Sequence, residues 1–248
     1  MKLSKKITVL LVSSLVLSSV FADEKGKEIM KRAEDKKSPS FTQSMVLMEL
    51  KDKSGSTDTR QVVQYGKDDG KKTSVVMDFK GPSSVKDTRF LQITNDNGPD
   101  DKWIYLPALK SVRRVNSSEG SKSFMGTDAT YDDLSSRKLE EDEHEFLREE
   151  TYTVSNGTSY ECNVVKNTPI DKKTDCPVHS EMYDKNGKLI KTLDVLKLEN
   201  INGYDVPMEN ILKNVQNGHS TSLKILKIAV DKPIPERVFT QQFLSTGK

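Results

Sequence analysis

Short stretches of alternating apolar and polar residues dominate the chain after about residue 40. Val75, Met77 and Phe79 alternate with Ser74, Asp78 and Lys80, although Val76 interrupts the polar side, and Leu91 and Ile93 repeat the pattern. This period of two is typical of β-strands with one face buried and one face in water. Residues 45–48 are apolar at every position. We therefore predict a protein that is mainly β, with cover on both faces of the strand at 45–48.

Turn-forming pairs separate these stretches at short intervals. Asn-Gly occurs repeatedly, for example at Asn186-Gly187 and Asn202-Gly203. It favours tight hairpins because both central residues of a type I′ turn need positive φ. We expect on the order of ten strands, joined mostly as an antiparallel meander in one curved sheet. No linker rich in Pro, Gly or Ser divides residues 23–248, which are predicted to form a single domain.

A few segments depart from the β pattern. Residues 23–37 carry a narrow apolar stripe that predicts a short helix, ended by Ser38-Pro39. Acidic residues after Thr127 favour a helical turn over residues 127–137. Residues 234–244 predict a short C-terminal helix or turn. Four apolar side chains can dock it onto the sheet: Val238, Phe239, Phe243 and Leu244.

The first 22 residues have the pattern of a secretory signal peptide. Three lysines precede an apolar run over residues 7–20, and Val20 and Ala22 occupy the positions that a signal peptidase reads. The alternative is an uncleaved anchor, but about 14 apolar-biased residues fall short of the roughly 20 that a spanning helix needs. We therefore predict cleavage after Ala22 and export of a soluble protein.

Composition limits the function more than it defines it. Without the three lysines of the leader, the chain has one more acidic than basic residue, so nothing in the overall charge suggests nucleic acid or an anionic membrane as a partner. Charged residues make up 31% and apolar residues 34%. A thick core is hard to build from that composition, whereas one curved sheet with a single apolar side is easier.

Two cysteines, Cys162 and Cys176, are expected to pair after export, because an oxidising compartment favours disulfides. A disulfide that closes a loop of about 15 residues would stabilise the folded protein by roughly 3 kcal/mol. The alternative is two free thiols. The spacing does not match the Cys-x-x-Cys pattern of a redox pair.

An ordered set of motifs resembles the LolA-like family of outer-membrane lipoprotein-sorting proteins. The set comprises residues 81–82, 86–91, 101–114 and 123–134, followed by 202–207 and 235–239. The resemblance implies an incomplete antiparallel β-barrel with short α-helices as a lid over an apolar cavity. It also implies a periplasmic carrier of acyl chains from lipoproteins or other envelope lipids. A sub-branch linked with lipid-exporting transporters is similar too, which makes an inner-membrane transporter a candidate partner.

A carrier needs an apolar wall, since each buried methylene contributes about 0.8 kcal/mol. Alternate strand residues and adaptable methionines can supply one. The alternative is that the same residues pack together as ordinary core. The candidate lining residues are Met45, Leu47, Val75, Met77, Phe79, Leu91, Ile93, Trp103, Tyr105, Phe124 and Met125.

Polar residues near this wall have candidate roles of their own. Arg113 and Arg114 could bind an anionic headgroup through their planar donors, or simply pair with nearby acids. Tyr131, with Asp132 and Asp133, is expected to belong to a lid that closes over cargo. We expect a monomer without cofactor or metal.

Two other classes of function remain as alternatives. A secreted hydrolase would have to use His144, His179 or His219, but the chain has no Gly-x-Ser-x-Gly motif and no helical pair of histidines for zinc. A β-rich adhesin or scaffold module would need no chemistry at all. We therefore predict a lipid carrier that is not an enzyme. Uptake of fatty ligands would distinguish such a carrier from an adhesin.

Overall fold

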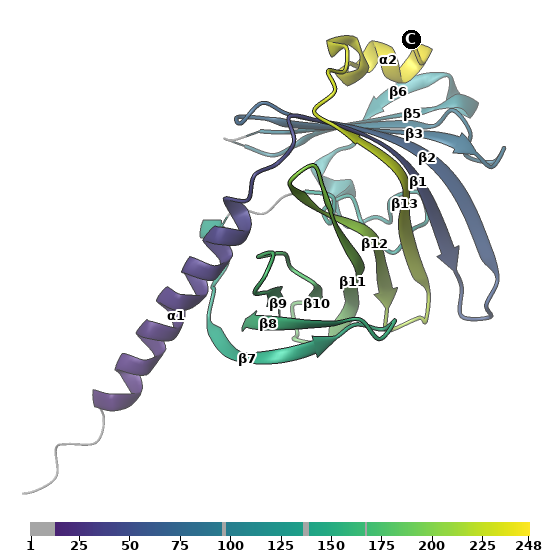
Figure 1. Cartoon of the computed structure of the whole chain (residues 1–248). Helices are drawn as coiled ribbons and strands as arrows, with labels where there is room; N and C mark the ends of the chain where they lie inside the picture. Colours follow the sequence, from purple (N-terminus) through teal and green to yellow (C-terminus); the bar gives the residue numbers. More distant parts are fainter. Residues whose placement is uncertain (1–12, 96–97, 136–138, 167) are drawn as a thin grey trace, which may run out of the picture.

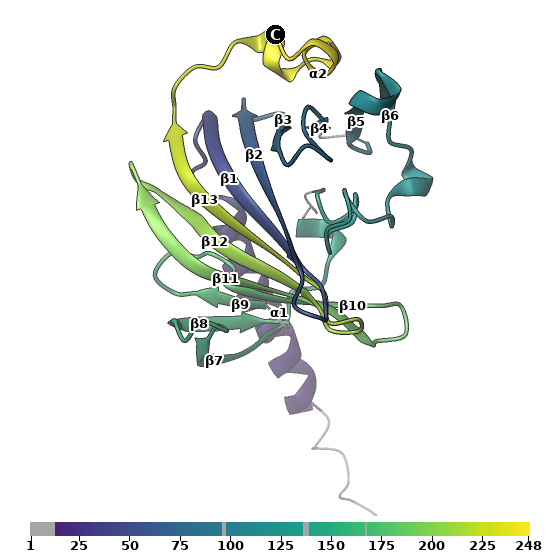
Figure 2. The same ribbon diagram turned by 90° about the vertical axis from the view of Figure 1, so that its right-hand side faces the viewer.

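Ten antiparallel strands form one sheet that curls without closing into a barrel (Figures 1 and 2). The structure is a computed structural model that describes residues 13–248 except 96–97, 136–138 and 167. The strand order is β10-β11-β12-β13-β1-β2-β3-β4-β5-β6, so pairing of β13 with β1 joins the late part of the chain to the early part. These strands are β1 (Phe41–Lys51), β2 (Thr57–Asp68), β3 (Thr73–Gly81), β4 (Arg89–Thr94), β5 (Asp101–Leu106), β6 (Ser111–Arg114), β10 (His179–Tyr183), β11 (Leu189–Ile201), β12 (Tyr204–Asn214) and β13 (Ser220–Val230).

A second, three-stranded antiparallel sheet and two α-helices complete the described part of the chain. The small sheet contains β7 (Phe146–Thr153), β8 (Ser159–Val165) and β9 (Thr168–Asp171). The helices are α1 (Ser13–Glu34) and α2 (Gln241–Thr246), with 3-10 turns η1 (Pro107–Leu109), η2 (Ser117–Glu119), η3 (Leu139–Glu141) and η4 (Glu236–Phe239). The predicted mainly-β class and curved sheet are confirmed, with more strands than expected because the small sheet was not foreseen.

The hairpin between β11 and β12 has the turn that its sequence requires. Asn202 and Gly203 both have positive φ, at 53° and 91°. A type I′ turn needs this at both central positions, and its twist matches the right-handed twist of the paired strands. The hairpin prediction from Asn202-Gly203 is therefore confirmed.

The two faces of the curled sheet carry different cover. Residues 115–135, which follow β6, lie inside the curve, whereas α2 lies outside it, over β3 to β6 (Figure 2). On the outside, Val76 and Leu91 are buried beneath η4 and α2. The four C-terminal apolar residues predicted to dock there are also buried, so the expected C-terminal helix and its docking are confirmed. Both faces of β3 and β4 are therefore apolar.

The second half of α1 packs on the small sheet. Ile29 is buried with Val165 and Ile170, and Met30 and Phe146 pack against them. Close contact is possible at Gly26, where a Cβ would lie 1.8 Å from the His144 carbonyl oxygen. The predicted helix over residues 23–37 is thus part of a longer helix that ends at Glu34.

More than half of the predicted signal peptide lies outside the residues that the structure describes. Residues 1–12 are not among the described residues, and α1 continues through Ala22, the expected cleavage point. No helix in the described ranges is long and apolar enough to cross a membrane. Cleavage after Ala22 therefore stays a prediction.

The segment inside the curve contains no α-helix in its described part. Residues 127–135 form turns and bends, with an isolated bridge between Ser123 and Thr130, and residues 136–138 lie outside the described residues. The helical turn expected from Thr127 is therefore wrong over residues 127–135. The Thr127 hydroxyl donates to the Phe124 carbonyl instead of capping a helix.

Candidate functional site

The concave face of the sheet is covered by residues 115–135, which we call the lid segment. Phe124 lies at the centre of this cover and is only 2% exposed. Its ring centroid is 5.0 Å from that of Phe90 and 6.3 Å from that of Phe79, both on the sheet, and 5.6 Å from that of Tyr131. The lid segment thus places its own aromatic side chains where an acyl chain on this face would lie.

Aliphatic and sulfur-containing side chains surround this aromatic group. Alternate residues of β1 and β5 point inward, because successive side chains of a strand face opposite sides. Met125 and Leu134 of the lid segment pack against the same core. The buried strand residues are Val46, Met48, Leu50, Val62 and Ile104.

The lid segment is also fastened through its backbone carbonyls. Three polar side chains on different strands of the sheet reach across the concave face, and all three are buried. Their donor groups are paired by the lid carbonyls, which a buried polar group requires. The bonds run from Arg60 Nη1 to the Met125 oxygen at 2.6 Å, from Gln92 Nε2 to the Leu134 oxygen at 2.8 Å, and from Lys102 Nζ to the Tyr131 oxygen at 2.6 Å.

Side-chain pairs hold the other edge of the lid segment to the late strands. Lys191 Nζ on β11 lies 2.5 Å from Asp133 Oδ2. The buried Asp128 accepts a hydrogen bond from the Thr221 hydroxyl at 2.8 Å, and His219 Nδ1 lies 2.7 Å from the same carboxylate. The lid segment therefore bridges β2, β4 and β5 at one end of the sheet and β11 and β13 at the other.

A cavity of about 650 Å³ lies where the two edges of the sheet face each other. Lys102 and Val115 line it from the β5–β6 edge, Met182 lines it from β10, and Tyr131 and Asp132 line it from the lid segment. Burial raises the pKa of the Tyr131 phenol, although the nearby Arg113 guanidinium opposes that shift. The opening of the incomplete barrel is therefore a mixed polar and apolar space beside the lid.

The candidate lining residues are divided between the two faces of the sheet. Phe79 and Phe124 belong to the concave core, and Met77 and Met125 pack against it. Val75 is half-buried and has the same parity along β3 as Met77 and Phe79, which places it on the concave side.

The other six candidates lie on the outer face. Leu91 is buried against the C-terminal segment, and the residues packed beside it are Ile93, Trp103 and Tyr105. Met45 is 44% exposed, and Leu47 follows it on the same side of β1. These six residues lie on the outer face because successive side chains of a strand point to opposite sides of the sheet, so a choice that is wrong by one position selects the other face.

The two arginines proposed for a headgroup are engaged by acids. Arg113 Nη1 donates to Glu119 Oε2 at 2.9 Å, and Arg114 pairs with Asp101. Hydrogen bonds from the Asn116 backbone and then from Arg113 hold the pKa of Glu119 below its ordinary value. The structure thus gives both arginines nearby acidic partners, which was the alternative to binding a headgroup. The expected role of Tyr131 in a lid stays a prediction.

The concave residues that the sequence analysis missed fall into two kinds. Val46, Met48, Phe90 and Ile104 are the immediate neighbours of residues that were named, and only knowledge of which face is concave would have selected them. The polar links of Arg60, Gln92, Lys102 and Lys191 gave no sequence signal, since their partners in the lid segment are 29 to 65 residues away in the chain.

The histidines make structural contacts. His179 Nδ1 lies 2.6 Å from Asp194 Oδ1, and the Tyr152 ring stacks on the imidazole at a centroid distance of 4.7 Å. Burial raises the pKa of Asp194, but bonds from His179 and Ser155 outweigh it and hold the pKa below its ordinary value. Among the described residues, no Ser, Thr or Cys side chain is hydrogen-bonded to a histidine ring, and no cluster of three His, Cys, Asp or Glu side chains could hold a metal.

The predicted disulfide between Cys162 and Cys176 is not formed, and both residues are buried free thiols. Cys162 is paired with Asp171 across the β8–β9 ladder, whereas the Asp171 amide donates to the Cys176 carbonyl on the other side of β9. A whole strand therefore separates the cysteines, about 10 Å at the usual strand spacing, which is beyond the reach of a disulfide. Burial raises the pKa of the Cys162 thiol to about 11.

Solved structures of known proteins share the curled-sheet fold described above. A domain from Vibrio parahaemolyticus, named for outer membrane lipoprotein sorting, is 27% identical with a TM-score of 0.80, over 90% of this chain and 99% of that chain. Residues 71–246 match a family model with the description "Uncharacterized protein". The chain belongs to the LolA-like family. No curated protein matches it.

Two further solved structures share the LolA-like fold. A DUF1329 family protein from Desulfovibrio piger is 24% identical with a TM-score of 0.80, over 90% of this chain and 99% of that chain. A LolA superfamily protein from Nitrosomonas europaea is 16% identical with a TM-score of 0.61, over 88% and 98% of the two chains. At these identities the likeness concerns the fold, and it extends over nearly all of each protein.

Proposed function

We propose that this LolA-like protein is a periplasmic carrier that binds acyl chains of lipoproteins or envelope lipids on its concave face and delivers them toward the outer membrane. The observation that carries the proposal is the lid segment, which fills an apolar concave face with its own Phe124, Met125 and Tyr131. An acyl chain would enter by replacing these side chains, with the lid segment moving away from the sheet.

The exchange is energetically balanced. Four large side chains of the lid segment lose their apolar surroundings when it opens: Phe124, Met125, Tyr131 and Leu134. At about 1.5–3 kcal/mol each, this costs roughly 6–12 kcal/mol. An acyl chain of about 14 buried methylenes contributes about 11 kcal/mol in return. The two occupants can therefore displace each other, as a carrier that both loads and unloads requires.

The cellular setting of the proposal rests on the leader and the family. A signal peptide over residues 1–22, cleaved after Ala22, would deliver the protein to the periplasm. A lipid-exporting transporter of the inner membrane would be the donor of the lipid. The protein would act as a monomer, without a cofactor and without catalysing a reaction.

Lipid extraction and mass spectrometry of the purified protein, followed by uptake of a fluorescent fatty acid, test the proposal. We expect the purified protein to contain bound lipid and to take up the fluorescent fatty acid saturably. An adhesin or scaffold module would contain no bound lipid and would not take up the probe. Failure of the delipidated, folded protein to bind any acyl probe would refute the carrier function.

A covalent link tests the lid movement. Asp128→Cys with Thr221→Cys, in a background of Cys162→Ala and Cys176→Ala, joins the lid segment to β13 where the Asp128 amide lies 3.0 Å from the Thr221 hydroxyl. We expect the oxidised protein to lose at least about 90% of acyl uptake, because a tenfold change needs only about 1.4 kcal/mol. Reduction of the same sample restores uptake and is the matched control. Equal uptake in both states would contradict the lid.

A further inference from the structure

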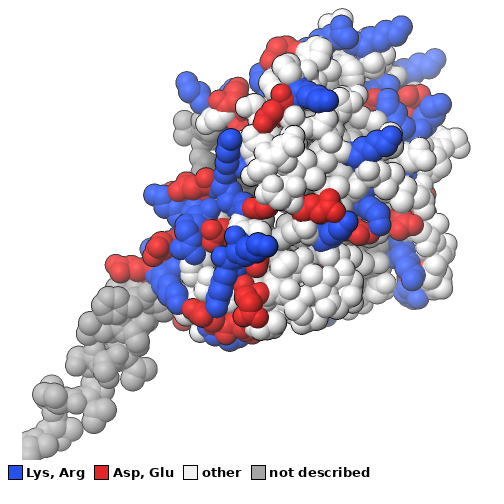
Figure 3. All heavy atoms as spheres, in the orientation of Figure 1, with Lys and Arg blue, Asp and Glu red and all other residues white. Residues whose placement is uncertain are grey.

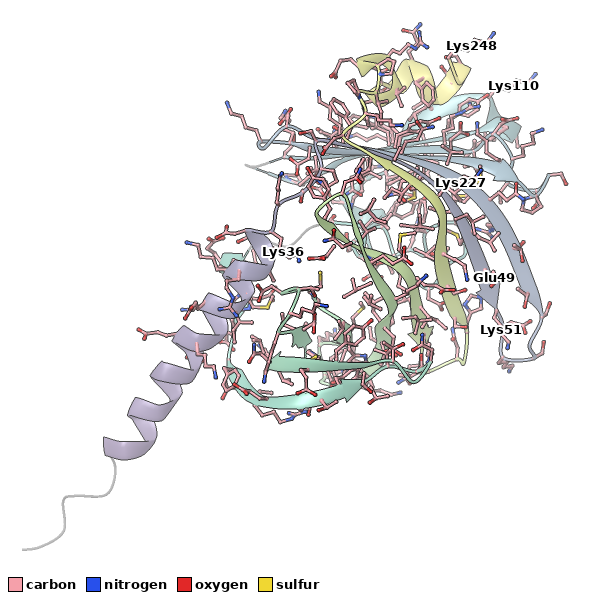
Figure 4. The ribbon with its side chains drawn as sticks, in the orientation of Figure 1. Lys36, Glu49, Lys51, Lys110, Lys227 and Lys248 are labelled. Atoms are coloured by element: carbon pink, nitrogen blue, oxygen red, sulfur yellow. The ribbon has the colours of Figure 1, made fainter. Side chains whose placement is uncertain are left out.

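Three segments meet at one end of the sheet to form a surface that we call the rim, defined by Lys86, Leu109, Lys110 and Lys248. Lys86 lies in the β3–β4 loop, Leu109 and Lys110 lie at η1, and Lys248 follows α2. The register of Arg89 opposite Tyr105 brings the loop beside η1. Arg89 Nη1 also donates to the Leu244 carbonyl at 3.0 Å, which brings the end of α2 to the same place. Lys110 and Lys248 both lie at this end of the molecule in Figure 4.

The rim carries three lysine side chains that pair with no acidic side chain among the described residues. Lys86, Lys110 and Lys248 are exposed, and among the described residues none of them forms an ion pair. The acids of the neighbouring segments are engaged elsewhere, Asp87 with Arg89 and Glu236 with Lys67. Lys and Arg side chains project from this end of the molecule in Figure 3. Such a surface attracts an anionic partner.

The rim also presents an apolar side chain at a rigid tip. Leu109 is 63% exposed, the largest exposed fraction of any large apolar side chain that the structure describes. The turn that carries it is fixed by Pro107 and by a hydrogen bond from the Lys110 amide to the Pro107 carbonyl at 3.1 Å. A single exposed leucine is common on protein surfaces. A rigid one flanked by unpaired lysines has the chemistry of a membrane interface, where apolar groups enter the headgroup layer and cations lie over phosphates.

We propose that the rim docks on an anionic lipid surface, with Leu109 inserted among the headgroups and the three lysines over lipid phosphates. Val85 and Leu106, which adjoin Lys86 and η1 in the chain, pack against the concave core on the inner side of the rim. A docked bilayer would therefore lie at one end of that core. The docking itself does not depend on the carrier function, since it needs no movement of the lid segment.

Flotation with vesicles of phosphatidylcholine, with and without phosphatidylglycerol, tests the rim on the intact protein. We expect binding to the anionic vesicles and release by high salt, because screening weakens exposed charges. Each lysine near an anionic surface changes affinity about fivefold, so Lys86→Gln, Lys110→Gln and Lys248→Gln together should weaken binding about 100-fold. Leu109→Ser alone should weaken it about tenfold.

Three exposed lysines elsewhere give a control with the same loss of charge. Lys51→Gln, Lys53→Gln and Lys227→Gln change β1, its following turn and β13; Lys51 and Lys227 lie away from Lys110 and Lys248 in Figure 4. We expect this control triple to bind nearly as well as the natural protein. Equal losses in the two triples, or no binding of the natural protein to anionic vesicles, would overturn the rim. Normal acyl uptake by the rim variants would show that the two proposals are separate.

Discussion

Replacing Phe124 by alanine distinguishes a lid that competes with cargo from a wall that contacts cargo. In the closed structure Phe124 is buried between Phe79 and Phe90 of the sheet and Tyr131 of the lid segment. If the lid segment leaves when an acyl chain enters, Phe124→Ala lowers the cost of opening. If Phe124 instead lines the bound acyl chain, the same change removes contact with cargo. The two mechanisms therefore predict opposite changes in affinity.

The magnitude follows from the buried side chain. Removing a fully buried phenylalanine ring forfeits about 1.5–3 kcal/mol of transfer free energy from the closed state. At about 1.4 kcal/mol for each factor of ten, acyl affinity should rise by about 10- to 100-fold. The free energy of unfolding should fall by about 3–5 kcal/mol, because the remaining cavity adds to the transfer cost. Higher affinity together with lower stability is the expected outcome.

Equilibrium titration with a fluorescent fatty acid, paired with denaturant unfolding, measures both quantities. Phe243→Ala is the matched control, since Phe243 is also buried but belongs to α2 and packs on the outer face of the sheet. It should lower the free energy of unfolding without raising acyl affinity. Weaker acyl binding by Phe124→Ala, in protein shown to be folded, would refute competition between the lid segment and the cargo.

Two further predictions follow from the faces of the sheet and from a lowered pKa. Trp103, the single tryptophan, packs on the outer face, so a brominated fatty acid bound on the concave face should quench its fluorescence weakly, and strong quenching would place the cargo outside. The pKa of Asp194 is lowered in the folded state, so its contribution to stability is present above the ordinary value of 3.8 and is lost as pH falls below it. Denaturant unfolding from pH 5 to pH 3 should therefore show a shallower loss of stability for Asp194→Asn than for the natural protein, and identical slopes would contradict this role.

Local patterns predicted the elements well because their causes are local. Alternation of apolar and polar residues predicted the strands. The pair Asn202-Gly203 predicted a hairpin, and both residues have the positive φ that its turn needs. Four apolar residues predicted the docking of the C-terminal helix. Which of the two faces of the sheet is concave does not depend on local sequence. Since β3 and β4 are apolar on both sides, alternation alone could not distinguish the face under the lid segment from the face under α2.

Contacts that depend on strand order were also beyond the sequence. The spacing of Cys162 and Cys176 suits a disulfide, but the intervening position of β9 prevents it. The partners of Arg60 and Lys102 became visible only once the lid segment was placed over the sheet. A loop length limits which residues can meet, whereas the topology decides which of them do.

In the proposed carrier cycle, the polar links would favour return of the lid segment to the sheet after the acyl chain leaves. In the closed structure Arg60 and Lys102 are buried and donate to lid carbonyls. Opening would remove the lid carbonyls from these donors, although Arg60 would keep its bonds to Asp58 on β2. Each donor group left unsatisfied and buried would cost about 1–3 kcal/mol unless water or polar atoms of a bound lipid replaced the carbonyl. An acyl chain alone satisfies none of them. In the proposed cycle the apolar exchange is nearly balanced, so donors left unsatisfied beneath a bound acyl chain would favour release of that chain and return of the lid segment to the sheet.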